Sequence, residues 1–407
     1  MFTLYGDGIH DDAPAIQEMI DNAGYELSLP SPQKHYLIGK SLVLPSHFAL
    51  RLPRYAEIRL ADGANCPMVT NLLHPDYAER LPDWTTPLCR HLWYHVNAYS
   101  PDIYEEGIEI TGGIWNFNNL NQLPNPEQSL DFTHKGYTGD GMFFYCVRGL
   151  RLAHMTFKDP VHYGATFDRV SDFTIEDIAF DYNYGNPVAV NMDGVHFNGN
   201  CHDGVIRNLK GACYDDLVAL NAHEGSRGPI TNVLIDGLFA EDCHSAVRLL
   251  TVDEMVSNIT IQNVYGSYYQ YCIGLSKYYP GESALGYDAI TIENIYARKA
   301  PRYEVYQKGD SYVYPLIWVQ DDVVVRNLTI RGVHRRETDT PVETVYVGRN
   351  TPVESMILED VTTTNTTGEP MPLLVNLGRI ESLHASALYP HGDPLVVGDG
   401  EIVECRM

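Results

Sequence analysis

The segment Ile259-Thr-Ile261-Gln-Asn-Val264 decides the fold, because close copies of it recur along the chain. In each copy two apolar residues stand two positions apart, Asn, Asp or Gly follows, and a third apolar residue ends the unit. The copies are Phe173–Ile178, Val233–Leu238, Ile290–Ile295, Leu328–Val333 and Met356–Val361, with weaker copies that start at Leu150 and near Val205. Period-two alternation followed by a turn-forming residue is typical of a short β-strand that ends in a turn.

The spacing of these units indicates a stack of irregular coils. The step from Leu152 to Ile175 is 23 residues, and the step from Ile292 to Ile330 is 38. Between the units lies a second set of strand-like runs: 162–169, 192–199, 216–222, 245–252, 270–277, 316–320, 343–349 and 372–378. Two or three short strands per coil, with no room for a helix in each coil, predict an all-β, right-handed parallel β-helix, which is a solenoid.

We expect a single solenoid domain over residues 1–407, since no Gly/Ser-rich or Pro-rich linker is present. Residues 1–50 form the predicted N-terminal cap region, and 145–380 hold the regular coils. Segments 71–104 and 118–140 interrupt the repeat and are rich in aromatic and polar residues. We expect them to form long loops that wall one side of the β-helix.

The N-terminal cap region carries a helix signal. Asp11-Asp12 can cap a helix that ends at Gly24. Its apolar residues Ala15, Ile16, Met19 and Ile20 recur at helical spacing and share one face. Such a helix covers the open apolar end that a solenoid otherwise exposes.

The composition excludes some partners. The chain has 53 acidic and 28 basic residues, a formal net charge of −25, which argues against a nucleic acid or an anionic membrane as partner. One locally basic cleft could still bind an acidic sugar. No apolar run resembles a signal or a membrane span, so we expect a cytoplasmic protein, or a secreted or periplasmic one whose signal has been removed. The sequence leaves the oligomeric state open.

The cysteines favour neither a metal centre nor a disulfide framework. The eight cysteines show no CxxC pair and no zinc-type spacing. Several fall inside strand-like runs, as Cys146 and Cys272 do, so buried free thiols are expected. We expect no metal and no cofactor.

Carboxylates gather where the second set of strands begins. The apolar residues that align these strands are Val195, Val218, Val247 and Ile273. Asp193 and Asp216 each stand two residues before one of them, and Asp215 adds a third carboxylate. Stacked parallel strands lie about 4.8 Å apart, so Asp193 and Asp216 should be neighbours. Packed carboxylates push one pKa upward, which divides acid from base as glycoside hydrolysis requires. The alternative is that these aspartates only cap turns.

Three segments around these carboxylates resemble glycoside hydrolase family 28, the polygalacturonases and rhamnogalacturonan hydrolases. They are Asn191-Met-Asp193-Gly194-Val195, Tyr214-Asp215-Asp216-Leu-Val218 and Ala246-Val247-Arg248-Leu249, and the similar organisation covers roughly residues 1 to 300. The resemblance implies hydrolysis with inversion. Asp215 or Asp216 would protonate the leaving oxygen, while Asp193 and the remaining aspartate hold the attacking water; we favour Asp215 as the acid.

The resemblance also implies residues that bind substrate. Arg248 matches the family's arginine, but the family's nearby lysine is Leu250 here, and Lys277 on the next coil could replace it. His223 is the first candidate for the family's histidine and is expected to be catalytic; His244 is its rival and is otherwise expected to bind substrate. Asn221 and His196 complete the expected substrate contacts. The expected partner is a pectin-like or related, possibly acidic, poly- or oligosaccharide.

Two other functions fit the same scaffold. A polysaccharide lyase or intramolecular transglycosylase would use Ca²⁺ or a neutralising side chain and a Lys, Arg or Tyr base. A non-catalytic solenoid would bind a glycan without changing it.

Overall fold

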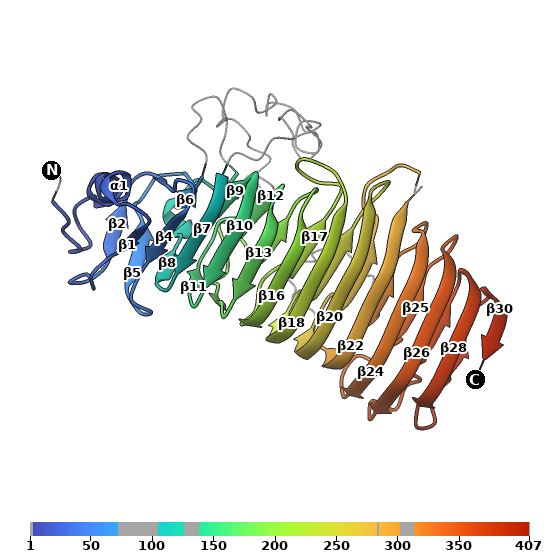
Figure 1. Cartoon of the computed structure of the whole chain (residues 1–407). Helices are drawn as coiled ribbons and strands as arrows, with labels where there is room; N and C mark the ends of the chain where they lie inside the picture. Colours follow the sequence, from blue (N-terminus) through green and yellow to red (C-terminus); the bar gives the residue numbers. More distant parts are fainter. Residues whose placement is uncertain (1–2, 72–104, 126–137, 283–284, 302–312, 407) are drawn as a thin grey trace. The chain divides into compact units, whose positions relative to one another are not determined.

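The computed structural model describes residues 3–71, 105–125, 138–282, 285–301 and 313–406. The chain divides into two compact units, whose helix and strands are labelled in Figure 1. The first comprises residues 1–205, 213–215 and 224–227, and the second comprises residues 206–212, 216–223 and 228–407. The expectation of one solenoid domain stays a prediction.

The first unit is built from three ladders of parallel strands. The first ladder runs through β1 (Glu26–Ser28), β4 (Phe48–Arg51), β7 (Glu105–Thr111), β10 (Val147–Ala153) and β13 (Ser171–Glu176). The second runs through β2 (Tyr36–Ile38), β5 (Glu57–Leu60), β8 (Ile114–Asn116), β11 (Thr156–Lys158) and β14 (Ala179–Asp181). The third runs through β3 (Leu42–Val43), β6 (Val69–Thr70), β9 (Met142–Tyr145), β12 (Ala165–Asp168) and β15 (Val195–Phe197).

The second unit has two ladders, also parallel. The long strands are β18 (Ile230–Cys243), β20 (Met255–Tyr268), β22 (Gly286–Lys299), β24 (Val325–Glu337), β26 (Pro352–Asn365), β28 (Arg379–Tyr389) and β30 (Glu401–Arg406). The short strands are β17 (Asp216–Asn221), β19 (Ser245–Leu250), β21 (Ile273–Ser276), β23 (Ile317–Val319), β25 (Val345–Val347), β27 (Leu374–Asn376) and β29 (Val396–Val397). β16 (His202–Lys210) contributes residues to both units.

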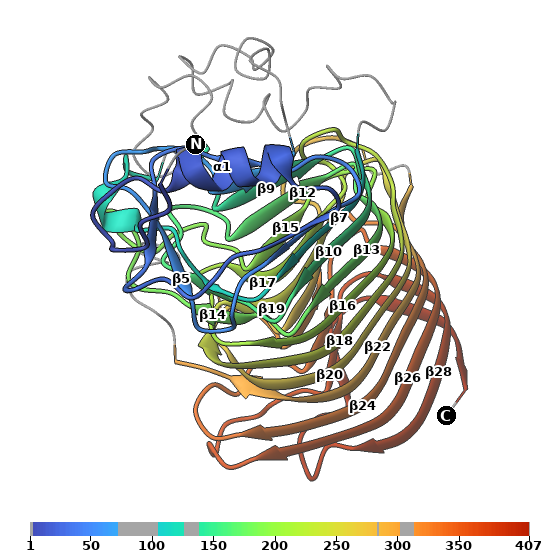
Figure 2. The ribbon, with the colours of Figure 1, turned by 60° about the vertical axis from the view of Figure 1, so that its left-hand side comes forward.

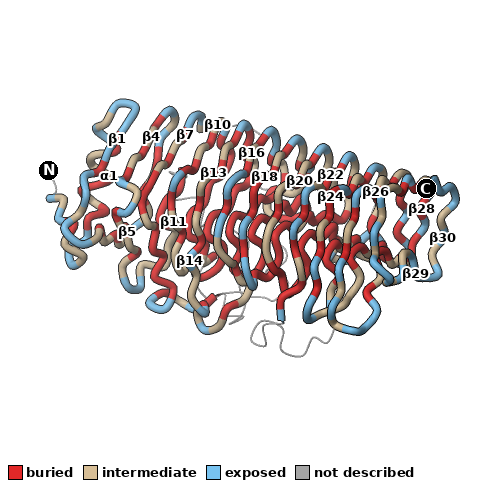
Figure 3. Tube along the Cα trace, turned by 90° about the horizontal axis from the view of Figure 1, so that it is seen from below, coloured by how far each residue is buried: buried red, intermediate tan, exposed pale blue. Residues whose placement is uncertain are grey.

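The sequence repeat predicts the register of these ladders correctly. In the first unit Leu152 pairs with Ile175. In the second unit the central residues of the repeat pair in order along one ladder: Ile235, Ile261, Ile292, Ile330 and Leu358. All are buried, and Figure 3 shows buried positions alternating with half-buried and exposed ones along the strands. The predicted right-handed parallel β-helix is confirmed.

The predicted turn residue is confirmed too, but its effect differs between the units. Asp177 has φ +53 in the first unit, and Asn263 has φ +59 in the second, a left-handed conformation that Asn, Asp and Gly tolerate best. In the first unit this residue separates two short strands, β13 and β14. In the second it lies inside one bent strand of 14 residues, β20.

The helix of the cap region is confirmed as α1 (Ala13–Asn22), at the N-terminal end of the first unit (Figure 2). Its residues Ala15, Ile16 and Ile20 are buried, and Met19 is half-buried. Capping differs from the expectation. The Asp12 carboxylate accepts hydrogen bonds from the amides of Tyr5 (2.6 Å) and Gly6 (3.2 Å), while Asp11 accepts from the first helical amide, that of Ala13 (2.9 Å).

The two predicted long loops, 71–104 and 118–140, lie mostly outside the described residues. Within the second of them, residues 119–121 form a short 3₁₀ helix, η1 (Asn119–Asn121). Along the described stretches, no helix has both the length and the apolar character that crossing a bilayer requires. No disulfide joins cysteines within the described part of the chain, and five of them are buried: Cys146, Cys201, Cys213, Cys243 and Cys272.

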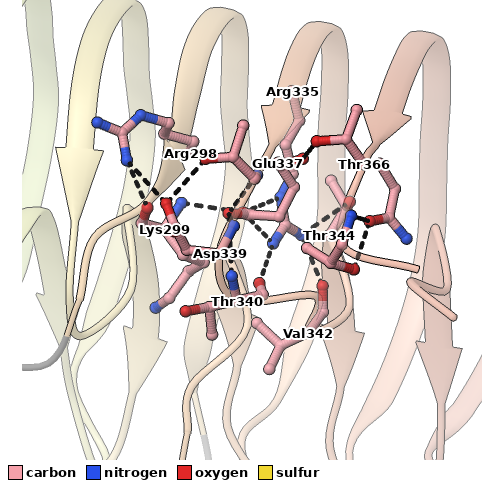
Figure 4. Close-up of polar contacts among 12 residues, drawn as sticks. Arg298, Lys299, Arg335, Glu337, Asp339, Thr340, Val342, Thr344 and Thr366 are labelled. Carbon is pink, nitrogen blue, oxygen red and sulfur yellow. Dashed lines mark hydrogen bonds and ion pairs between the residues drawn. The ribbon is translucent and has the colours of Figure 1, made fainter. Parts of the chain in front are cut away.

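A buried cluster of charges joins two long strands of the second unit, β22 and β24 (Figure 4). Arg335 Nη2 lies 2.7 Å from Glu337 Oε2, and both side chains are fully buried. The backbone amide of Lys299 donates to the same oxygen at 3.1 Å, and its ammonium group donates to the carbonyl oxygen of Gln270. Burial, and then the charge of Arg335, lower the pKa of Lys299 to about 7.

The low pKa of Lys299 predicts that stability rises with pH. An unfolded lysine keeps its proton up to about pH 10.4, so between pH 7 and that value the unfolded state binds more protons. Replacing this lysine by methionine removes the buried charge. Lys299→Met should therefore have a larger free energy of unfolding than wild type at pH 7. The difference between the two should narrow by on the order of 3 kcal/mol by pH 9.5.

Urea unfolding at pH 6, 7, 8.5 and 9.5 measures this gap. Lys40→Met, which changes an exposed lysine, is the control and should not alter the pH dependence. A Lys299→Met profile parallel to the wild-type profile would contradict a neutral lysine in the folded protein.

Candidate active site

The site in the second unit begins where β17 and β19 start. Asp216 pairs in register with Ser245, whose hydroxyl donates a hydrogen bond to Asp216 Oδ1. The other oxygen, Oδ2, lies 3.1 Å from Nε of Arg248. The Asp216 carboxylate is buried, while the Arg248 side chain keeps 19% of its surface exposed. A hydrogen bond to one oxygen and an ion pair to the other thus compensate the burial of this carboxylate.

Arg248 is itself held by aromatic residues. Its Nε also donates to the hydroxyl of Tyr271 at 2.8 Å. The ring of Tyr271 lies against Gly274, where an added Cβ would come within 2.7 Å of a ring carbon. On the same side the ring stacks on Trp318, with 5.4 Å between centroids. Gly274 thus leaves the space that the ring needs beside the guanidinium group.

His244 completes the group around Asp216. Its Nδ1 lies 3.0 Å from the Ser245 hydroxyl oxygen. Because the single hydroxyl proton of Ser245 goes to Asp216, Nδ1 of His244 carries a proton and donates it. A ring nitrogen of His244 also lies within 4.8 Å of an Asp216 carboxylate oxygen. His244, Ser245 and Asp216 therefore form a buried polar chain.

Asp215 and Asp193 are both buried. Asp215 directly precedes Asp216 in the chain. Asp193 belongs to the first unit, where its Oδ2 lies 2.6 Å from Nδ1 of His196. The expected proximity of Asp193 to Asp216 stays a prediction, because the two residues belong to different units.

His196 lies on β15 and has a second acidic partner. Its Nε2 is 3.0 Å from Glu224 Oε2, and all three side chains of this group are buried. Burial lowers the pKa of His196, but the hydrogen bonds to Asp193 and Glu224 outweigh it and raise the pKa to about 10. The two carboxylate partners therefore favour the cationic form of His196.

The remaining predicted residues lie in other surroundings. His223 Nδ1 is 3.2 Å from Asp253 Oδ1, and its ring faces Tyr279. Asn221 is buried at the end of β17. Lys277 follows β21, is half-buried, and makes no ion pair with a described residue.

The position that replaces the family's lysine belongs to the core. Leu250 is fully buried and pairs in register with Ser276 rather than with Lys277. Of the two candidate histidines, the described contacts connect His244 to Asp216.

Sequence reasoning missed three contributors: Glu224, Ser245 and Tyr271. Ser245 carries a signal, because it stands one coil beyond Asp216 in the predicted alignment of strands. Tyr271 carries the same signal, because it stands two residues before Ile273 as Asp216 does before Val218, whereas Glu224 carries none, since it lies in a connecting segment whose course the repeat does not determine.

Comparisons with known proteins support the fold. No protein-family model matches the sequence, and no curated protein is similar to it in sequence. Several solved structures do resemble the chain, at low identity. A family 28 exopolygalacturonase of Yersinia enterocolitica has 14% identity and a TM-score of 0.55 over 97% of this chain and 78% of its own.

Two further structures span nearly the whole chain. An endo-xylogalacturonan hydrolase of Aspergillus tubingensis has 13% identity and a TM-score of 0.53, over 98% of each chain. The surface adhesin PfbA of Streptococcus pneumoniae has 12% identity and a TM-score of 0.52, over 100% of this chain and 90% of its own. At such identities the comparisons establish a right-handed β-helix fold, which enzymes and an adhesin share.

One group among the described residues could hold a metal ion, namely Asp215, Asp216 and His244. The guanidinium group of Arg248 already balances the charge of Asp216, so a cation there would meet repulsion. We therefore predict that a chelator leaves the melting temperature unchanged, and that Ca²⁺, Mn²⁺ and Zn²⁺ do not raise it. Differential scanning calorimetry measures both effects. A rise with one of these ions that is lost in Asp216→Asn would contradict the prediction.

Proposed function

We propose that the protein is an inverting glycoside hydrolase that cleaves a pectin-like or related poly- or oligosaccharide. The observation that carries the proposal is the buried Asp216 carboxylate, ion-paired with Arg248 beside Asp215. Two of the solved structures that share the fold are enzymes named for galacturonan substrates. The local sequence around all three aspartates resembles the same family.

The contacts support separate roles for the carboxylates, one as the acid and two as groups that position the water. Asp216 accepts from Ser245 and pairs with Arg248, so it keeps its negative charge and suits the positioning of water. Asp193 is paired with cationic His196 and suits the same role. Asp215 is then the residue that protonates the leaving oxygen, as inversion by two opposed carboxyl functions requires.

Arg248 supports an acidic or strongly hydrogen-bonding sugar at this position. It is partly exposed, and its guanidinium can donate to a uronate carboxylate. Leu250 supplies no second cation beside Arg248. A uronate carboxylate should therefore bind less tightly here than in the family that the sequence resembles. Trp318, half-buried beside Tyr271, offers an apolar edge on which a sugar ring can pack.

The first test is a digest of pectic, rhamnogalacturonan and other acidic and neutral glycans. Wild type should release reducing ends without ultraviolet absorbance, and a chelator should have no effect. Asp215→Asn should lose about 10²-fold or more in rate, because the leaving oxygen receives no proton. Asp360→Asn, at an exposed turn with φ +51 that Asn also tolerates, is the control.

Other outcomes of this digest decide against the proposal. Absorbance from unsaturated sugars would indicate a lyase. Full activity in Asp215→Asn would remove this aspartate from the mechanism.

The two candidate histidines can be separated by matched substitutions. His244→Gln should lower kcat about tenfold or more, because it breaks the polar chain to Asp216. His223→Gln should leave kcat unchanged, because its partner is Asp253. Steady-state kinetics on the substrate found in the digest measures kcat for both variants. A loss of kcat in His223→Gln but not in His244→Gln would contradict the choice of His244.

A non-catalytic glycan-binding solenoid is the second candidate. A row of stacked rings on the long strands of the second unit favours it: Phe239, Tyr265, Tyr296 and His334, with centroids 4.9 to 5.1 Å apart. Phe239 and Tyr296 are more than a third exposed. This candidate predicts glycan binding without product, retained when all three aspartates are replaced.

A further inference from the structure

The imidazole of His196 lies between two carboxylates in the first unit. On β15, the neighbours of His196 are Val195 and Phe197, whose side chains are fully buried in the core. Alternation along the strand directs His196 to the opposite face of the sheet. There its Nδ1 lies 2.6 Å from Asp193 Oδ2, and its Nε2 lies 3.0 Å from Glu224 Oε2.

The hydrogen bonds around Nε2 show that this nitrogen carries a proton. Asn198 Nδ2 donates to Asp168 Oδ2 at 3.1 Å, which orients the amide so that its oxygen faces His196. That oxygen lies 3.1 Å from Nε2. Nε2 therefore faces two acceptors, the Asn198 oxygen and the Glu224 carboxylate. Because Nδ1 faces the Asp193 carboxylate, both ring nitrogens act as donors, as in an imidazolium.

The surroundings of the ring also favour a positive charge. Tyr163 stacks on His196 with 3.9 Å between centroids and 6° between planes, which suits a cation over an aromatic face. His162 stacks on Tyr163 at 3.6 Å and pairs with Asp140. A further carboxylate, Asp168, accepts the hydrogen bond from Asn198 and interacts with the positive charge of Arg169.

We propose that His196 is a positioning residue: as an imidazolium held by Glu224, it keeps Asp193 ionised and directed so that Asp193 accepts a proton from the attacking water. This role rests on the proposed hydrolase function. Glu224 acts through His196, and neither residue needs to touch the substrate.

The arrangement gives Asp193 one role and excludes another. A carboxylate that receives a hydrogen bond from an imidazolium is stabilised in its charged form, so Asp193 enters the reaction as a base and not as the acid that protonates the leaving oxygen. It remains a base and a water-holding group. One imidazolium offsets one of the two buried carboxylate charges, and Glu224 supplies the second contact that fixes the ring.

The first experiment observes the imidazolium directly and needs no substrate. In ¹⁵N-histidine-labelled protein, the His196 signals are assigned by their loss in His196→Gln. They should show a doubly protonated ring through pH 8. Glu224→Gln should lower the midpoint of this titration by one pH unit or more, roughly the effect of losing one buried carboxylate. Glu106→Gln, at an exposed glutamate, should not.

A neutral His196 ring in the wild type at pH 7 would overturn the proposal. So would a midpoint that Glu224→Gln leaves unchanged.

The second experiment is the pH profile of kcat/KM on the glycan that the digest identifies. His196→Gln keeps a hydrogen-bonding side chain but removes the cation, so Asp193 should become protonated at higher pH. The acidic limb should move up by about one pH unit, while His154→Gln, at an exposed histidine, leaves it in place. A uniform loss of rate without a shift would indicate only a structural role and overturn the proposal.

The two experiments separate the possible failures. If no glycan is cleaved while the imidazolium is observed, the hydrolase function fails and the catalytic role of His196 fails with it. If the hydrolase is confirmed but the ring is neutral, only the positioning role fails.

Discussion

Parallel hydrogen bonding between successive coils is the interaction on which the other features of this protein depend. It brings strands about 4.8 Å apart, so residues one coil apart in sequence become neighbours in space. In the core this stacks Ile261 on Ile292 and Val218 on Val247. At the strand entrance the same register sets Ser245 beside Asp216, where its hydroxyl can reach the carboxylate.

Stacking also concentrates charge, and the structure balances it locally. A buried charge without a partner would be strongly destabilising. Arg248 balances Asp216, and His196 is held between two carboxylates. Burial, and then the positive charge of Arg335, lower the pKa of Lys299, whose backbone amide donates to the carboxylate that pairs with Arg335. The pairs formed by Arg248 and by His196 involve the candidate catalytic carboxylates. The cluster of Lys299 and Arg335 lies farther along the chain, on β22 and β24.

The repeat was sufficient to predict the fold, the register and the turn residues, because each depends on period-two alternation and on residues that tolerate positive φ. The resemblance to the family, and not the repeat, put Asp216 and Arg248 in one candidate site. The repeat could not predict that the two short strands of a coil in the first unit correspond to one long strand in the second. It has the same kind of turn residue in both units. Nor could it choose His244 over His223 or find Glu224. Those contacts depend on how connecting segments fold back, and the alternation of apolar residues carries no information on that path.

The proposed glycan cleavage takes place where β17 and β19 begin. A crystal structure of Asp215→Asn with a bound oligosaccharide from the cleaved glycan tests this most directly. The account predicts a glycosidic oxygen within hydrogen-bonding distance of residue 215 and a sugar group in contact with Arg248. A sugar chain bound only along the stacked rings of Phe239, Tyr265 and Tyr296, with none near Arg248, would contradict it.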